Sequence, residues 1–364
     1  MLPPGCEPRC NACGHRSLSL SESLNQKHSY LRTTLSPWAD RLAEVLSVDA
    51  RQRLGYRDKV SLAALFSKGV WSFGMLQRDE VIPIPDCPVH SANVNKVVWL
   101  LAENLPPYED FPLHRVVISG KQLTLILKSS CLPAVKFSSF LSEQLAVNGI
   151  QGVWLHLFPS SGRKVFGKGG WHLLAGNPTS TDESGLIYGP AAFQQLIPSL
   201  ARQALDTSSA YLRPSGDSIL ADLYCGTGSG LKLWTAAGAS VIGVELSQQA
   251  MKLASLNAPE AKILVGTCTQ RIPQLNAWNS SFHDNLRRLL YVNPPRTGLE
   301  PDITTWIGCH YQPERIAYLS CSQGTLKRDL LQLAAFSYVV EKIQPYDFFP
   351  LTRQVECLVL LKRA

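Results

Sequence analysis

The hydrophobic and polar positions divide the chain into two parts with different patterns. Up to about residue 185, apolar stretches of strand length are separated by turns of glycine, proline and serine. An amphipathic helix is expected at residues 36–46, with Ser36 as its cap and Pro37 in its first turn. Strands are predicted at residues 56–62, 69–75, 115–118, 122–127 and 152–158. The first part is therefore expected to be a β-rich α+β domain.

From about residue 190 the pattern becomes an alternation of helices and apolar strands. A helix is predicted at residues 193–205, and a strand, a glycine-rich loop, a helix and a second strand follow within residues 218–245. Further strands are predicted at residues 261–265, 289–292 and 315–319. Such alternation implies βαβ units and a mostly parallel sheet, so the second part is expected to be α/β. We place the two domains at residues 1–200 and 201–364.

Composition adds three constraints to this picture. The 364 residues suffice for two domains, and the 35 Lys and Arg against 28 Asp and Glu suit a polyanionic partner. No apolar stretch reaches the length of a membrane span, and the amino terminus lacks the apolar core of a signal peptide. We therefore expect a cytoplasmic protein without membrane association. In that compartment the ten cysteines are expected to be metal ligands, catalytic groups or core residues, not disulfides.

The glycine-rich loop lies in ADLYCGTGSG, residues 221–230, between a strand and a helix. Gly226, Gly228 and Gly230 allow a tight turn and a close approach of backbone amides to a ligand. Asp222 just before the loop would repel a pyrophosphate but attract a cation, and the dinucleotide spacing GxGxxG is absent. Glu245 follows Gly226 by about 19 residues at the end of the next strand, where it can bind ribose hydroxyls. These features favour S-adenosylmethionine (SAM) over NAD.

Two later strands also end in residues that suggest chemistry. In LLYVNPPRTGLEP, residues 289–301, Asn293 offers a donor and an acceptor to a nucleobase or an amino group. In YLSCSQGTLKRD, residues 318–329, Cys321 stands where a strand gives way to a polar turn. The carboxyl ends of strands in open α/β sheets are where ligands bind, although a buried, inert thiol is the alternative for Cys321.

These motifs together resemble the uracil-C5 RNA methyltransferase family, which makes 5-methyluridine in tRNA and 23S ribosomal RNA. The resemblance covers nearly the whole chain, because DLYCGTG, GVELS, NPPRTGLEP, YLSCSQGTLKRDL and PYDFFPLTRQVECLVLL occur in the family's order. It is greatest for the shorter ribosomal-RNA members, which lack a TRAM barrel and carry an iron-sulfur cluster. It implies a Rossmann-like SAM methyltransferase domain at the carboxyl end and a 23S rRNA substrate.

The resemblance also implies roles for individual residues. Cys321 matches the nucleophile that adds to uracil C6, and Glu356 matches the general base that removes the C5 proton. Arg296 or Arg328 is a candidate for lowering the pKa of the thiol. Ser322, Gln323 and Gly324 replace the usual turn after the nucleophile. The residues that match the SAM-binding positions, together with the loop glycines, are Gln194, Tyr224, Gly226, Gly228, Glu245 and Asn293.

The amino-terminal cysteines form a separate motif, with Cys6, Cys10 and Cys13 in CEPRCNACGH and the distant Cys87 in IPDCPVHS. Four such thiolates suit a [4Fe–4S] cluster, an arrangement that the resemblance favours. Zinc is the alternative, held by the four cysteines or by three of them with His15 or His90.

The partner expected from the resemblance is RNA. The target uridine must be unstacked or flipped into the site, so we expect a loop or single strand, bound by a monomer. Arg57, Lys59 and Arg78 alternate with aromatic residues in predicted strands and are candidates for RNA contact, although a solvated strand face is the alternative. Two other functions remain open: an amino-directed nucleic-acid methyltransferase that uses Asn293 to Arg296, and a noncatalytic RNA-binding homologue.

Overall fold

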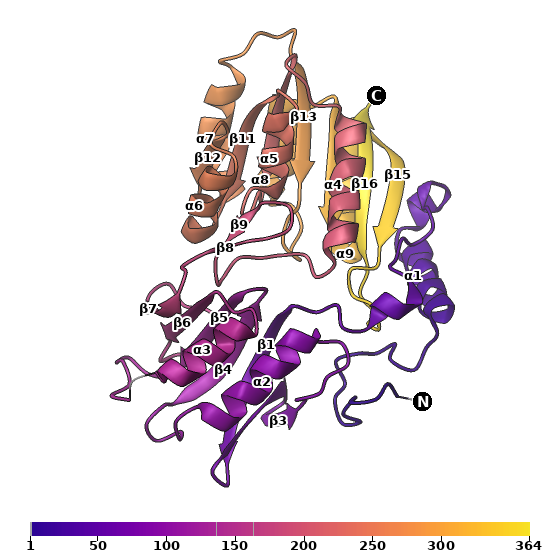
Figure 1. Cartoon of the computed structure of the whole chain (residues 1–364). Helices are drawn as coiled ribbons and strands as arrows, with labels where there is room; N and C mark the ends of the chain where they lie inside the picture. Colours follow the sequence, from indigo (N-terminus) through magenta and orange to yellow (C-terminus); the bar gives the residue numbers. More distant parts are fainter. Residues whose placement is uncertain (1, 136, 163) are drawn as a thin grey trace. The chain divides into compact units, whose positions relative to one another are not determined.

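The computed structural model describes residues 2–135, 137–162 and 164–364, and these form two compact units (Figure 1). Unit 1 comprises Met1–Ser17 and Asp49–Leu196, and unit 2 comprises Leu18–Val48 and Ile197–Ala364. The chain therefore enters unit 2, leaves it to form most of unit 1, and then returns. Among the described residues, no helix has both the length and the apolar character needed to cross a membrane.

Unit 1 is built on a seven-stranded sheet in the order β3-β2-β1-β4-β5-β6-β7. Only β5 and β6 pair in parallel; the other neighbours are antiparallel. The strands are β1 Lys59–Ser67, β2 Val70–Gln77, β3 Glu80–Pro83, β4 Leu113–Ser119, β5 Gln122–Leu127, β6 Gly152–Leu157 and β7 Trp171–Gly176. A short ribbon of β8 (Ser180–Thr181) and β9 (Ile187–Tyr188) follows.

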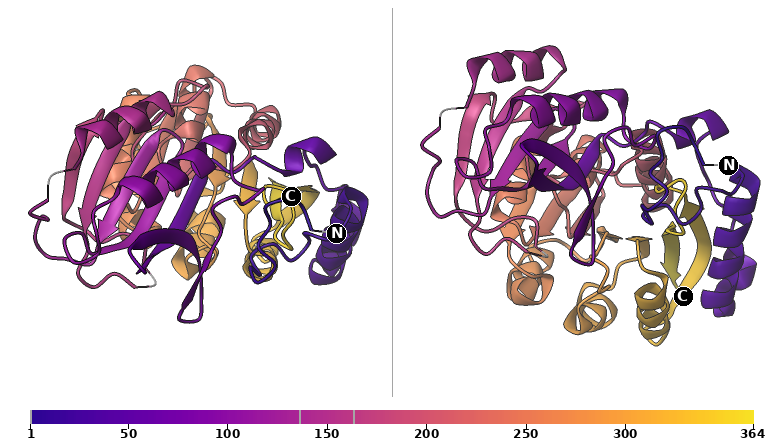
Figure 2. Two further views of the ribbon diagram at one scale, coloured as in Figure 1. Left: turned by 60° about the horizontal axis from the view of Figure 1, so that its bottom comes forward. Right: turned by 90° about the horizontal axis from the view of Figure 1, so that it is seen from below.

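Helices α2 (Ala92–Asn104) and α3 (Ser139–Val147) lie along one face of this sheet (Figure 2). In α2, Ser91 caps the first turn by accepting a hydrogen bond from the Val94 amide. Its buried residues recur at helical spacing and pack against the apolar side chains of the strands: Val94, Val97, Val98 and Leu101. Unit 1 is therefore the expected β-rich α+β unit, in which the apolar faces of the helices pack against the sheet.

Unit 2 is an α/β structure whose sheet has the order β12-β11-β10-β13-β14-β16-β15. The strands from β12 to β14 run parallel, and β16 and β15 are antiparallel additions. The strands are β10 Ser218–Leu223, β11 Ser240–Glu245, β12 Lys262–Val265, β13 Arg287–Val292, β14 Arg315–Ser320, β15 Tyr338–Tyr346 and β16 Glu356–Arg363. The α/β fold expected from the alternating pattern is confirmed.

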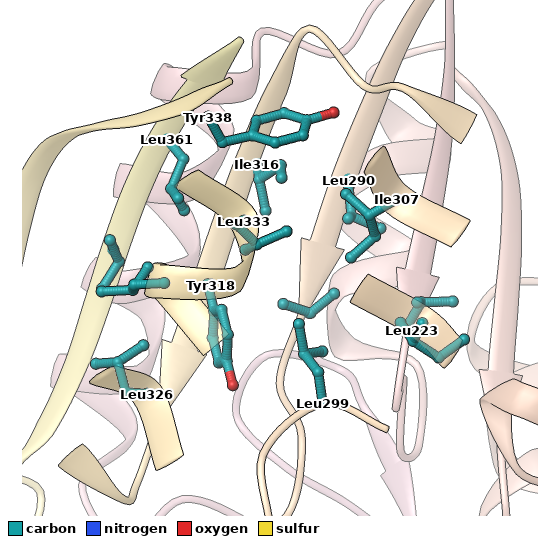
Figure 3. Packing of buried hydrophobic residues seen from close by; sticks show 14 of the residues in the cluster. Leu223, Leu290, Leu299, Ile307, Ile316, Tyr318, Leu326, Leu333, Tyr338 and Leu361 are labelled. Atoms are coloured by element: carbon teal, nitrogen blue, oxygen red, sulfur yellow. The ribbon is translucent and has the colours of Figure 1, made fainter. Parts of the chain in front are cut away.

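Helices cover both faces of the unit 2 sheet (Figure 1). One face carries α4 (Pro198–Leu212), α5 (Ser229–Ala236) and α6 (Gln248–Asn257). The other carries α1 (Leu20–Thr34), α7 (Cys268–Asn279), α8 (Pro301–Trp306) and α9 (Gln323–Ala334). Figure 3 shows part of the core on this second face, where Ile316 and Tyr318 of β14 lie near Leu326 and Leu333 of α9.

Two predicted helices differ from those observed. Residues 36–46 form only a 3-10 turn, Ser36–Arg41, because the amides of Ala43 and Leu46 instead donate to the carbonyls of Ile343 and Pro345 in β15. The helix predicted to begin at residue 193 begins at Pro198, since the residue before a proline is disfavoured in helical conformation.

A buried ion pair attaches α1 to the rest of unit 2. The Lys27 ammonium lies 2.5 Å from the Asp347 carboxylate, and both side chains are fully buried. Lys27 also donates a hydrogen bond to the Phe349 carbonyl at 3.3 Å. A buried charge without its partner is strongly destabilising, so this pair ties the early segment to the turn that precedes β16.

We expect Lys27→Met to lower the free energy of unfolding by about 3–5 kcal/mol, because it leaves the Asp347 carboxylate buried without a counter-charge. Urea denaturation measures the loss. Lys252→Met, at an exposed lysine of α6, is the control and should change it by less than about 0.5 kcal/mol. The double variant Lys27→Met/Asp347→Asn should recover much of the loss; equal stability of the wild type and Lys27→Met would contradict this view of the pair.

Candidate active site

The residues expected to bind SAM or react within unit 2 lie at one edge of its sheet. Parallel strands β10, β11, β13 and β14 all end at this edge, and antiparallel β16 begins there. The edge therefore brings together the glycine-rich loop after β10, Glu245 at the end of β11, Asn293 after β13, Cys321 after β14 and Glu356 at the start of β16. Such an edge is the usual ligand site of an open α/β sheet.

The glycine-rich loop turns sharply from β10 into α5. Tyr224, Gly226 and Gly228 all have positive φ angles, of 63°, 57° and 87°. Gly228 is the amino-terminal cap of α5, and a Cβ there would lie 3.1 Å from the Cα of Ala254. The Tyr224 side chain packs beside the core, and burial raises the pKa of its hydroxyl. The loop therefore offers its backbone, more than the Tyr224 hydroxyl, to a ligand.

Asp222 lies beneath this loop and is almost fully buried. Its Oδ2 accepts a hydrogen bond from the Trp234 indole at 2.9 Å, while Oδ1 has no hydrogen-bond partner among the described residues. Burial raises the pKa of Asp222 to about 7, the Trp234 hydrogen bond opposes this rise, and the Glu245 charge adds to it. A buried carboxylate with an oxygen to spare is suited to a cationic ligand.

The Glu245 carboxylate accepts hydrogen bonds from the glycine-rich loop and from the residue that caps α6. One oxygen accepts the Gly226 amide at 3.0 Å, and the other accepts the Ser247 amide at 2.6 Å. Asn293 leaves β13 with its own amide donated to the Leu223 carbonyl at 3.3 Å. Glu245 is therefore the last residue of β11 and Asn293 directly follows β13, the two strands that pair with β10.

Cys321 and Glu356 are neighbours across the antiparallel pair of β14 and β16. The ladder pairs Ser320 with Cys357, and continuing that register by one residue places Cys321 opposite Glu356. Opposite residues of an antiparallel pair project from the same face. Cys321 is half-buried, whereas Glu356 is 3% exposed. The register thus brings Cys321 near Glu356, although the two are distant in the sequence, and the Glu356 charge acts on the Cys321 thiol.

The pKa of the Cys321 thiol is raised, first by burial and then by the charge of Glu356. The Arg296 guanidinium opposes both effects through its charge and a hydrogen bond to the thiol. Of the two arginines considered from the sequence, Arg296 is therefore the one that acts on Cys321. Its backbone is held beside α9 by a hydrogen bond from the Thr325 hydroxyl to the Arg296 carbonyl, at 3.2 Å.

Arg328 and Asp329 together hold the loop that follows Asn293. The Arg328 guanidinium donates to the carbonyls of Thr297 and Leu299 and to the Asp329 carboxylate. The second oxygen of fully buried Asp329 accepts the Leu299 amide at 2.8 Å and the Tyr318 hydroxyl at 2.7 Å. These contacts fasten the loop after Asn293 to α9 and β14, and nothing in the local sequence pattern indicated the role of Asp329.

Gln194, the remaining SAM-site candidate, lies in unit 1, in the non-helical segment that ends that unit. The segment is anchored to β1, because the Lys59 ammonium donates to the Ala192 carbonyl at 2.6 Å and lies 5.3 Å from the centre of the Phe193 ring. Burial lowers the pKa of Lys59 to about 8. Lys59 is thus engaged within unit 1, while Arg78 is exposed on the turn between β2 and β3.

The four amino-terminal cysteine candidates gather in unit 1. Gly5 lies so close to Asp86 that a Cβ on Gly5 would clash with the Asp86 carbonyl. The segment that contains Cys6, Cys10 and Cys13 is therefore near Cys87, the residue after Asp86. Burial and the nearby Cys87, Cys10 and Cys6 raise the pKa of Cys13 to about 11.

No cluster of three or more His, Cys, Asp or Glu side chains among the described residues has the arrangement of a metal site. Arg16 closes the cysteine loop by donating to the carbonyls of Glu7, Pro8 and Cys10. His90, a candidate zinc ligand, has its Nδ1 at 3.2 Å from the Asn95 side-chain oxygen, and burial lowers its pKa to about 4. The cysteines are therefore close together but not disposed as ligands in this structure.

Comparison with known proteins shows that the chain is similar to RNA methyltransferases. The sequence profile of the tRNA (uracil-5-)-methyltransferase family matches residues 279–364. An uncharacterized RNA methyltransferase of Thermosynechococcus vestitus is 26% identical over 98% of this chain and 84% of that protein. The 23S rRNA (uracil(747)-C(5))-methyltransferase RlmC of Vibrio cholerae is 25% identical over 98% of both chains.

A solved structure has a similar fold over almost the full length. The tRNA (uracil-54, C5)-methyltransferase of Pyrococcus abyssi, in complex with S-adenosyl-L-homocysteine, superimposes with a TM-score of 0.72 at 20% identity. The superposition covers 96% of this chain and 85% of the archaeal chain. The chain is thus similar in sequence to RNA methyltransferases over almost its full length and has the fold of the archaeal enzyme, and the uracil-C5 methyltransferase profile matches the segment that contains Cys321 and Glu356.

Proposed function

We propose that this protein is a SAM-dependent RNA methyltransferase that forms 5-methyluridine. The observation that carries the proposal is the placement of Cys321 opposite Glu356, at the same sheet edge as the glycine-rich loop. Pyrimidine C5 is a weak carbon nucleophile. A thiolate can activate it by adding to the ring, and a nearby carboxylate can then remove the C5 proton. RlmC of Vibrio cholerae and the methyltransferase of Pyrococcus abyssi act on uracil C5 of RNA, which agrees with this chemistry.

The residues around the glycine-rich loop fit SAM. Asp222 has a buried oxygen without a partner, which suits a cationic group, and Glu245 stands where ribose hydroxyls are bound in related sheets. Tyr224, Gly226 and Gly228 would contribute backbone groups, and Asn293 would contribute a side-chain amide. When bound, SAM supplies an electrophilic methyl group.

Cys321 and Glu356 divide the remaining chemistry between them. The Cys321 thiolate adds to C6 of the uracil, and the electron pair of the C5–C6 double bond moves to give an enolate. C5 would then take the methyl group, with S-adenosylhomocysteine as the leaving group. Glu356 accepts the C5 proton, the C5–H electrons restore the double bond, and the C–S bond breaks to return the thiolate. Arg296 stabilises the thiolate form of Cys321 by its charge.

The RNA substrate is proposed to be 23S rRNA. The support is the likeness to RlmC over 98% of both chains, and the excess of seven positive charges suits an RNA partner. Because C6 is inaccessible in a stacked helix, the target uridine must be flipped from a loop or single strand. A cytoplasmic monomer remains our expectation.

We further propose that Cys6, Cys10, Cys13 and Cys87 hold a [4Fe–4S] cluster with a structural role. The support is their convergence in unit 1, shown by the approach of Gly5 to Asp86 and by the effect of three cysteines on the pKa of the fourth. Ligation would require the thiols to adjust and deprotonate. Zinc is the alternative metal for the same thiolates.

Incubation with labelled SAM and unmodified 23S rRNA, followed by nucleoside analysis, should yield 5-methyluridine. Cys321→Ala should abolish turnover, and Glu356→Gln should lower it by about 10²–10⁴-fold while methylated RNA stays bound to the protein. Cys309→Ala, at an exposed cysteine of unit 2, is the control. Methylation by Cys321→Ala at the normal rate would exclude the covalent route, and a methylated exocyclic amine would indicate the amino-directed reaction.

The alkylation rate of Cys321 should rise with pH above the usual range for a cysteine, since burial and Glu356 raise the pKa of its thiol. Arg296→Met removes the opposing positive charge and should move the profile to still higher pH. Mass spectrometry of the tryptic peptide 316–327, which contains no other cysteine, measures the rate. Arg353→Met, at an exposed arginine, should leave the profile in place; the same result for Arg296→Met would show that Arg296 does not act on the thiol.

Anaerobically purified protein should contain about four iron atoms per chain. Cys13→Ser and Cys87→Ser should each lower the iron content and the visible absorbance, because each removes a proposed ligand. Cys131→Ser, at an exposed cysteine outside the group, should not. Stoichiometric zinc without iron would favour the zinc alternative, and protein without either metal would contradict the proposed cluster.

A further inference from the structure

The turn after Cys321 contains a buried side chain that the proposed reaction has not yet used. Gln323, the first residue of α9, is 7% exposed. It lies in the Ser322-Gln323-Gly324 stretch that departs from the family pattern. A buried amide must be hydrogen-bonded to be tolerated, so the partners of Gln323 indicate its role.

Both contacts of the Gln323 amide are with residues adjacent to Glu356. Its Nε2 donates to the Val355 carbonyl at 2.5 Å. Burial raises the pKa of the Cys357 thiol, and a hydrogen bond with the Gln323 side chain opposes this rise. Val355 precedes Glu356 and Cys357 follows it. The Gln323 side chain therefore contacts the residues on both sides of the candidate base.

The Val355 carbonyl lies just outside the hydrogen-bonded ladder of the sheet. The pairs that β16 makes with its two neighbours begin at Glu356 and Cys357, so Val355 stands just before the ladder. On its other side, Gln354 donates its amide to the Thr352 hydroxyl, which in turn donates to the Phe349 carbonyl. Gln323 therefore provides a tertiary hydrogen bond at the junction between this turn and the strand.

Gln323 is also closely coupled to the nucleophile. Cys321 is only two residues away, and the short stretch between them is held because the Ser322 amide donates to the Ser320 hydroxyl at 3.3 Å. The Ser322 carbonyl accepts the Leu326 amide in the first turn of α9. The contact between Gln323 and Val355 thus connects the backbone that carries Cys321 to the backbone that carries Glu356.

We propose that Gln323 is a positioning residue that holds Glu356 opposite Cys321 for removal of the C5 proton. This inference rests on the proposed function, because it assigns Gln323 to one step of that reaction. In that step the C5 proton passes to the Glu356 carboxylate, the C5–H electron pair forms the C5–C6 double bond, and the C6–S pair returns to Cys321. Gln323 touches none of the reacting atoms and acts only through Glu356.

The first test compares Gln323→Met, which keeps the length of the side chain but cannot donate, with Gln332→Met at an exposed glutamine of the same helix. Gln323→Met should lower turnover about 10- to 100-fold, as expected for a displaced catalytic group, and leave a covalent complex of protein and 5-methylated RNA on denaturing gels. Gln332→Met should resemble the wild type. Normal turnover of Gln323→Met, or a folded variant that binds SAM but forms no covalent complex, would overturn the proposal.

The second test needs no RNA and separates this inference from the proposed function. If the wild type makes no 5-methyluridine, the proposed function fails, but the geometric assignment can still be judged from Cys321 alkylation in the peptide 316–327. Loss of the contact between Gln323 and Val355 should let Glu356 move away and shift the alkylation profile of Gln323→Met to lower pH. An unchanged profile, with that of Gln332→Met as reference, would show that Gln323 does not position Glu356.

Discussion

The antiparallel pairing of β14 with β16 is the constraint on which the candidate active site depends. Five parallel strands can present only the residues that follow their carboxyl ends at the ligand-binding edge. An antiparallel strand reverses this polarity and brings its first residues to the same edge. Cys321, after the end of β14, therefore meets Glu356, at the start of β16, and their register is determined by the ladder that begins with Ser320 and Cys357.

This pairing is useful only if the turns on either side of it are held in place. Asp329 holds the loop after Asn293, and Lys27 holds the turn that leads to β16 through the Asp347 carboxylate and the Phe349 carbonyl. Gln323 joins the two sides. Each of these is a buried polar side chain bonded to backbone or to an opposite charge, and such groups specify one arrangement because alternatives would leave them unsatisfied.

The electrostatics of the site balance two opposing effects at one sulfur. Burial and the Glu356 charge favour the neutral thiol, and Arg296 favours the thiolate. In the proposed reaction Glu356 must nevertheless lie close to Cys321, because it takes a proton from the carbon next to the one that the sulfur attacks. The loop that contains Arg296 is therefore as much a part of the candidate site as Cys321 and Glu356, and Arg328 and Asp329 belong to the site because they hold that loop.

The amino-acid sequence by itself determined the α/β character of unit 2, the place of the glycine-rich loop, and the positions of Asn293 and Cys321 after their strands. These follow from hydrophobic periodicity and turn residues, which are properties of neighbouring positions. Only the tertiary structure decided that Leu18–Val48 packs within unit 2, that residues 42–46 run beside β15, and that Arg296 acts on Cys321 while Arg328 holds a loop. It also decided the contacts of Gln323 with Val355 and of Asp329 with Leu299. Each of these contacts depends on hydrogen bonds or charges between residues far apart in the chain. A local sequence pattern does not indicate which distant group will be the partner.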